Sequence, residues 1–244
     1  MKYTDVLMCL ALAGLISAST RAEESKNTRL FILSGQSNMS FDEKRDFAVH
    51  VEKALPGERI VVVKHSVGGM PIWHWFKAWK PPENGKPVPG VPEKLGETYD
   101  ALLAKVAKSG VDPKTATSVT LIWMQGEAEG RNAVTCEVYE ASLKGLIQQF
   151  RDDLKRPDMH VVIGRLNDAQ MQRESWKTVR KAQETVAKND KFGAWINSDD
   201  LNGDDNNVHN NAEGTKELGR RFANAALKLI QSNGPEERRR SSRK

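Results

Sequence analysis

A serine near the start of the chain and a histidine near its end are the residues best suited to chemistry. Ser37 lies in the segment SGQSNM (34–39), directly after an apolar run typical of a strand. A serine between a strand and a helix can use its own N–H and the helix dipole to stabilise an oxyanion. His209, in the acidic segment DDNNVH (204–209), is placed to act as a base. Alone, each residue would indicate only turn chemistry or a structural role, but together they favour nucleophilic catalysis.

The elements that must bring these two residues together follow from the hydrophobic pattern. Short apolar or β-branched runs alternate with helical patterns, which indicates βαβ units and a parallel sheet. The predicted strands are 29–33, 60–63, 119–123, 160–163 and 193–196. Helices are predicted over 42–55 and 99–108 and around the apolar stripes at 139–150, 176–186 and 218–229. Because ligands bind at the carboxyl ends of parallel strands, we expect Ser37 and His209 to meet at that edge.

A long connection, residues 66–92, interrupts this alternation. Five prolines between residues 81 and 92 prevent regular structure. It also holds Trp73, Trp75 and Trp79, half of the six tryptophans, which favours an ordered and partly exposed surface. We expect Trp73 and Trp75 to offer aromatic faces to a ligand, while at least one tryptophan serves only to anchor the loop.

The first 22 residues resemble a secretory signal peptide. An apolar run spans 6–18, and a small-residue stretch ends at Ala22. The run is shorter than the roughly 20 apolar residues that a membrane-spanning helix needs. We therefore expect export to the periplasm or medium and no membrane insertion of the mature chain. Removal of the leader leaves Cys136 as the only cysteine, which excludes an intramolecular disulfide.

The formal net charge of +5 lies mostly at the ends of the chain. Residues 234–244 carry +3 and the leader carries +1, which leaves +1 for the remainder. Such a nearly neutral body does not favour nucleic acid as a partner. The basic tail is expected to be disordered and solvated. With 244 residues, the chain is long enough for one α/β domain and short for two, so the predicted organisation is a leader (1–22), one domain (23–233) and a tail (234–244).

Several motifs together resemble a known family. They are GQSNM (35–39), Gly68-Gly69, WMQGE (123–127), and His209 followed by Gly214 and LGRRFA (218–223). In this order they are similar to the sialate O-acetylesterase and acetylxylan esterase group, which is carbohydrate esterase family six of the SGNH hydrolase superfamily. The resemblance spans residues 28–229, and the co-occurrence of GQSNM and QGE is its most specific part.

The resemblance implies a flavodoxin-like, three-layer α/β/α sandwich and ester hydrolysis through an acyl-enzyme, without a cofactor or metal. Ser37 would be the nucleophile and His209 the general base. The oxyanion hole would combine the Ser37 N–H, the N–H of Gly68 or Gly69, and the Gln125 side chain. Flanking Ser37, Gln36 and Asn38 would contact the substrate. A further polar residue, Arg165, follows the fourth strand and would either meet an acidic sugar or form a structural ion pair.

The acid that orients the histidine is the departure from the family pattern. Relatives usually have aspartate three residues before the histidine, where this chain has Asn206. Asparagine can hold an imidazole by a hydrogen bond but cannot stabilise an imidazolium by charge. Two carboxylates could replace it. They are Glu127, which belongs to the family motif and which we favour, and Asp205, one residue out of register.

Three functions fit the sequence. The first is a carbohydrate O-acetylesterase with acetylated carbohydrate as substrate, and the second is an esterase acting on a non-sugar ester. The third is a catalytically dead glycan-binding protein of the same fold. The retention of Ser37, Gln125, Glu127 and His209 favours an enzyme. No cluster of histidine, cysteine and carboxylate has metal-ligand spacing, and the sequence does not determine the sugar, the acetyl position or the oligomeric state.

Overall fold

The computed structural model describes residues 27–83 and 87–233. The predicted leader and basic tail lie outside the described residues. Within them, five parallel strands form one sheet in the order β2-β1-β3-β4-β5. The strands are β1 (Thr28–Gly35), β2 (Arg59–Ser66), β3 (Ser118–Met124), β4 (His160–Gly164) and β5 (Gly193–Ile196). All five predicted strands are confirmed, each within a few residues of its predicted ends.

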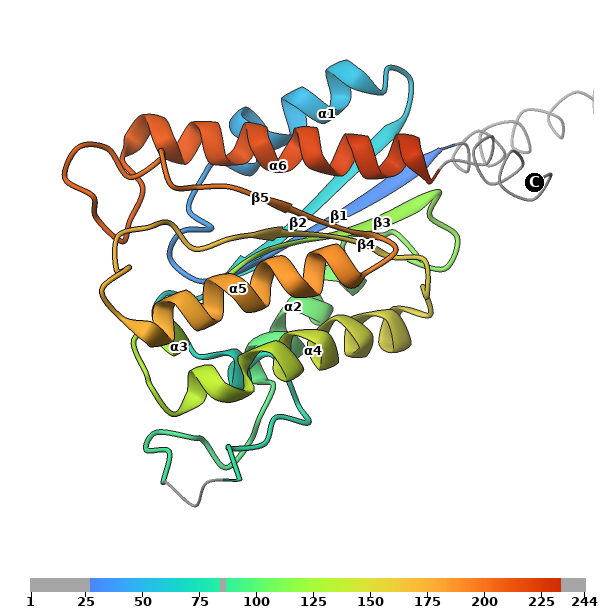
Figure 1. Cartoon of the computed structure of the whole chain (residues 1–244). Helices are drawn as coiled ribbons and strands as arrows, with labels where there is room; N and C mark the ends of the chain where they lie inside the picture. The colour runs from blue at the N-terminus through green and yellow to red at the C-terminus, as the bar shows by residue number, and fades with distance from the viewer. Residues whose placement is uncertain (1–26, 84–86, 234–244) are drawn as a thin grey trace, which may run out of the picture.

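Helices cover both faces of the sheet, so the predicted α/β/α sandwich is confirmed (Figure 1). One face carries the π-helical turn η1 (Glu43–Ala48) with α1 (Val49–Ala54) and α6 (Ala212–Ser232). The other carries α2 (Glu97–Lys108), α4 (Tyr139–Leu154), α5 (Glu174–Asn189), the short α3 (Glu127–Gly130), and the 3-10 turns η2 (Ile72–His74) and η3 (Thr135–Val138). None of the helices in the described ranges is both long and apolar enough to cross a membrane.

Alternation of side chains along the strands divides the core between the two layers. In β3, Val119, Leu121 and Trp123 pack beneath α2, α4 and α5, whereas Ile122 and Met124 pack beneath α1 and α6. All five side chains are essentially inaccessible to solvent. A strand buried on both faces has no polar side to show, which is why its sequence is almost continuously apolar.

The strand order determines where the functional residues gather. From β1 the chain crosses to β2 on one side, and from β2 it crosses back past β1 to β3 on the other side. The crossover direction therefore reverses, and the switch point lies between β1 and β3. At such a switch point the loops at the carboxyl ends diverge and leave room for a ligand. Ser37 follows β1 and Gln125 follows β3, which places both motifs at this point.

Candidate active site

The turn after β1 presents Ser37 at the carboxyl edge of the sheet. Gly35 has φ +140°, and a Cβ there would lie 1.9 Å from the Met124 carbonyl oxygen, so only glycine fits. The Gln36 N–H donates to that same carbonyl at 2.8 Å, which joins the turn to β3. Ser37 is partly exposed, and its Oγ lies 3.0 Å from Nε2 of His209. The structure thus brings together two residues that are 172 positions apart in the chain.

His209 is carried by the histidine loop, which we define as residues 197–211 between β5 and α6. The imidazole is exposed, whereas the adjacent Val208 is buried. The Asn167 side chain, after β4, donates to the carbonyls of Asn207 and Val208, both at 3.1 Å. At the end of the loop, Asn211 caps α6 by accepting from the Gly214 N–H at 2.7 Å. Hydrogen bonds on both sides of His209 therefore define its position.

A buried pair of side chains, Asn38 and Glu127, is hydrogen-bonded to the same loop, and we call this pair the base clamp. Asn38 Nδ2 donates to Glu127 Oε1 at 2.7 Å and to the Val208 carbonyl at 3.0 Å. The Asn38 Oδ1 accepts from the Asn210 N–H at 3.2 Å. Asn38 and Glu127 are 4% and 1% exposed. The clamp thus holds the backbone immediately before and after His209, and Asn38 is itself the neighbour of Ser37.

One glycine of the loop after β2 lies beside the serine. We define residues 67–72, after β2, as the glycine loop. A Cβ built on Gly68 would lie 3.7 Å from the Ser37 Cβ, and Gly68 is exposed. In the described ranges, the N–H groups of Ser37, Gly68 and Gly69 have no hydrogen-bond acceptor. Gly69 has φ +74°, a turn conformation that favours glycine. Free N–H groups next to a nucleophile are what an oxyanion hole requires, and Gly68 is the nearer candidate.

Gln125 does not take the position that the sequence predicted for it in the oxyanion hole. Its side chain is fully buried, and its Nε2 donates to Glu129 Oε2 at 2.7 Å and to the Met70 carbonyl at 3.2 Å. Both amide hydrogens are therefore occupied. The reason is the neighbouring carboxylate of Glu129, which offers the amide a charged acceptor inside the protein.

The four predicted substrate contacts are also corrected, because all of them are buried. Gln36 is 3% exposed, and Asn38 belongs to the base clamp. Trp73 is 4% exposed, with its ring centroid 4.9 Å from that of Trp79. Trp75 is inaccessible, packs edge-on against Trp123 and donates from its indole nitrogen to Ser34 Oγ at 3.0 Å. These indoles anchor the connection 66–92 to the sheet, since large apolar side chains gain most from full burial.

None of the three predicted partners of the imidazole contacts it directly. Glu127 bonds to Asn38 instead, and Asn206 accepts from the Asn202 side chain at 2.7 Å. Asp205 is exposed. Among the described residues, no carboxylate is hydrogen-bonded to His209. Asn206 has φ +44°, a left-handed conformation that asparagine tolerates. The favoured direct contact from Glu127 is therefore wrong for this structure.

Two buried carboxylates lie at the start of α3. Burial raises the pKa of the Glu127 carboxyl, and the hydrogen bond from Asn38 opposes that rise. Burial raises the pKa of Glu129 to about 7, and hydrogen bonds from Ile72 and Gln125 oppose it. Sequence reasoning missed Glu129 and Asn167. The signal for Glu129 was its place in the segment QGEAE (125–129), two residues after a motif glutamate.

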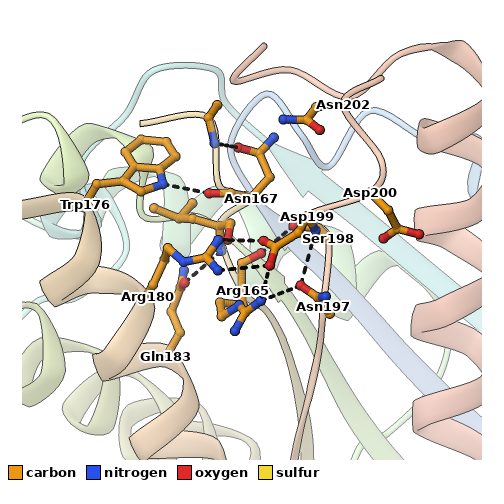
Figure 2. A network of polar contacts seen from close by, with 12 residues as sticks. Arg165, Asn167, Trp176, Arg180, Gln183, Asn197, Ser198, Asp199, Asp200 and Asn202 are labelled. Carbon is orange, nitrogen blue, oxygen red and sulfur yellow. Dashed lines mark hydrogen bonds and ion pairs between the residues drawn. The ribbon is translucent and has the colours of Figure 1, made fainter. Parts of the chain in front are cut away.

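Arg165 is a structural ion-pair residue. Its guanidinium bonds Glu184 and Asp199, each at 2.6 Å, and Arg180 also pairs with Asp199 at 2.6 Å. Figure 2 shows Asp199 between the two arginines. Ser198 Oγ donates to the Arg165 carbonyl at 2.6 Å. Of the two readings left open by the sequence, the ion pair is confirmed, and the network anchors the start of the histidine loop.

Comparisons with solved structures identify the fold. The fold is similar to that of a protein from Arabidopsis thaliana, with a TM-score of 0.64 and 18% identity over 82% of this chain and 98% of that chain. It is also similar to that of a carbohydrate acetylesterase from Xanthomonas citri, with a TM-score of 0.59 and 15% identity over 84% of this chain and 57% of that chain. A third similar structure is that of NanS, with a TM-score of 0.57 and 13% identity over 86% of this chain and 99% of that chain. The fold is that of the SGNH hydrolases. A search of curated protein sequences found no match.

The family is shown by a sequence model. Residues 40–228, more than three quarters of the chain, match the family described as carbohydrate esterase, sialic acid-specific acetylesterase. The chain belongs to this family and is a carbohydrate O-acetylesterase. The matched range includes Gln125, Glu127 and His209, and it begins three residues after Ser37.

Proposed function

We propose that this protein removes O-acetyl groups from carbohydrate by a serine mechanism, with Ser37 as nucleophile and His209 as general base. The observation that carries the proposal is the 3.0 Å contact between Ser37 Oγ and His209 Nε2. This distance lies within the hydrogen-bond reach that a nucleophile and its base require. The free N–H groups of Ser37 and Gly68 beside it supply the second requirement of acyl transfer.

The proposed reaction proceeds in two halves. His209 Nε2 takes the Ser37 proton as Oγ bonds to the acetyl carbon, and the carbonyl oxygen becomes an oxyanion facing the two N–H groups. The bond to the sugar oxygen then breaks, and that oxygen takes the proton from His209, which leaves acetyl-Ser37. Water attacks the acetyl carbon and gives its proton to His209. The Ser37 oxygen leaves with that proton, and acetate is released.

In this proposal the imidazole is oriented by its loop and not by a carboxylate at Nδ1. The base clamp and Asn167 hold the backbone on both sides of His209. Because no carboxylate within 27–83 and 87–233 is hydrogen-bonded to the ring, the pair acts as a Ser–His dyad. Glu127 is linked to the histidine loop only through Asn38. Exposure of His209, Gly68 and Gly69 leaves the serine accessible to a bulky sugar.

Turnover of a chromogenic acetyl ester tests the mechanism. Ser37→Ala should abolish turnover, and His209→Ala should lower kcat by on the order of 10⁴-fold or more. Ser40→Ala, in the same turn and exposed, is the matched control and should keep wild-type activity. Acetate release from acetylated xylan, pectin and sialic acid then assigns the sugar. Full activity of Ser37→Ala would refute the serine mechanism, and glycan binding without any turnover would favour the non-catalytic alternative.

A further inference from the structure

A second buried amide–carboxylate pair is hydrogen-bonded to the glycine loop, much as the base clamp is hydrogen-bonded to the histidine loop. Glu129 Oε1 accepts from the Ile72 N–H at 2.6 Å, and Glu129 Oε2 accepts from Gln125 Nε2 at 2.7 Å. The same Nε2 donates to the Met70 carbonyl at 3.2 Å. We call Glu129 with Gln125 the oxyanion clamp. It holds the backbone at two points, immediately after Gly68 and Gly69.

The two clamps have the same construction. Each takes its carboxylate from the short helix α3, with Glu127 and Glu129 two residues apart. Each carboxylate accepts from a side-chain amide, and that amide donates to one loop carbonyl. Two residues after that carbonyl, a loop N–H is also bound. The Asn210 N–H donates to the Asn38 amide oxygen, and the Ile72 N–H donates to the Glu129 carboxylate. Both glutamates are essentially inaccessible to solvent, at 1% and 0% exposed.

We propose that Glu129 is a positioning residue that fixes the glycine loop so that the Gly68 N–H faces the oxyanion. Two adjacent glycines have little conformational preference of their own, and both are exposed. An N–H in such a segment stabilises a transition state only if another group holds it in place. Among the described residues, Glu129 is the carboxylate that is hydrogen-bonded to this loop. Its bonds are strongest when it is ionised, because bonds to an ionised acceptor are roughly twice as strong as neutral ones.

The inference rests on the proposed serine mechanism, and its test separates the two loops. The ratio of kcat/KM for an acetyl oxyester to that for the matching thionoester reports oxyanion stabilisation, because sulfur accepts hydrogen bonds weakly. Glu129→Gln keeps the volume of the side chain and one acceptor oxygen. It should lower this ratio by on the order of 10-fold, with KM for the oxyester nearly unchanged, since loss of a whole oxyanion donor costs about 10²-fold or more.

Glu127→Gln is the matched control, because Glu127 is an equally buried glutamate of the same helix. It should slow both esters alike and leave the ratio unchanged. Both rates are measured on the same active molecules, so loss of folded protein cancels from the ratio. If Glu129→Gln yields no active protein, Glu129→Asp is measured instead. Its carboxylate is on a side chain one methylene shorter, which moves it away from the loop, and it should also lower the ratio.

A wild-type ratio in the Glu129 variant, or an equal fall in both glutamate variants, would overturn the inference. Failure of the serine mechanism has a different signature. In that case Ser37→Ala would turn over both esters at the wild-type rate, whereas failure of the inference alone leaves Ser37→Ala inactive.

Discussion

The glycine loop and the histidine loop reach the same serine, but they are supported by different means. Beyond the oxyanion clamp, the chain that follows the glycine loop is anchored by buried indoles, with Trp75 inaccessible and bonded to Ser34. The histidine loop buries smaller apolar side chains, Leu201 and Val208. It is held at its start by the ion pairs of Asp199, and around His209 by the amide side chains of Asn38 and Asn167. Packing of large rings and hydrogen bonds from amide side chains resist displacement in different ways, because packing is non-directional and hydrogen bonds depend on geometry.

The difference suits what each loop must do. An oxyanion donor has to be in place before charge develops, since reorganisation during the reaction would cost the stabilisation it supplies. A histidine that acts as general base exchanges protons with three groups in turn: the serine, the leaving sugar oxygen and a water molecule. A loop tethered by hydrogen bonds around an exposed ring leaves access for these partners. Changes in the two clamps should therefore have separable effects.

The largest expected effect concerns the pH dependence of stability. Burial raises the pKa of Glu129 from its usual 4.5 to about 7. The folded state therefore holds this proton more tightly than the unfolded chain does. Protonated Glu129 therefore adds its whole contribution to the free energy of unfolding below about pH 4.5. That contribution is lost as pH rises through about 7. At 1.36 kcal/mol per pKa unit, the loss is on the order of 3 kcal/mol.

Urea unfolding at pH 5 and pH 7.5 measures this loss. The wild type should be less stable at the higher pH, and Glu129→Gln should remove most of the decrease because glutamine does not ionise. Glu127 remains in both proteins and accounts for the residual slope, since burial raises its pKa too. An identical decrease in wild type and variant would mean that Glu129 ionises as readily in the folded protein as in the unfolded chain.

A second prediction concerns the base clamp. Asn38→Ala removes all three contacts that join Glu127 to the histidine loop. It should lower kcat by on the order of 10²-fold with little change in KM, because positioning of the base is lost while substrate contacts remain. Glu127→Gln should cost only on the order of 10-fold, since the amide oxygen still accepts from Asn38.

Steady-state kinetics with a chromogenic acetyl ester check this order, with Ser40→Ala as the control. The reverse order, with Glu127→Gln more damaging than Asn38→Ala, would show that Glu127 acts on the imidazole directly during the reaction. The thionoester ratio should not change in either variant, which distinguishes both from Glu129→Gln.

The smallest expected effect is that of restoring the aspartate usual in relatives. Asn206→Asp should change kcat by less than about threefold, because the side chain at φ +44° bonds the Asn202 amide and aspartate can make the same bond in that conformation. Asp205→Asn should be equally mild, because Asp205 is exposed and has no contact with His209. A tenfold rise for Asn206→Asp would instead mean that the loop turns to bring this carboxylate to the ring.

The sequence by itself determined the sheet, the longer helices that cover it and the edge where the site lies, but not the short helix α3. Continuous apolar runs such as 119–123 predict strands buried on both faces, and helical stripes such as 218–229 predict the covering layers. Both rest on local periodicity, which any reading of the chain reveals. The pairing of Ser37 with His209 followed from the rule that loops at the carboxyl ends of parallel strands converge.

Only the tertiary structure decided what the polar residues of the motifs do. Gln125, Asn38 and Glu127 were predicted to act on substrate or histidine, yet each turns into the interior and bonds another buried group. A motif specifies a residue type at a position, but the direction of its side chain depends on which partner lies within about 3 Å. The loop carbonyls that bind Gln125 and Asn38 come from distant parts of the chain, so they could not be predicted from sequence spacing.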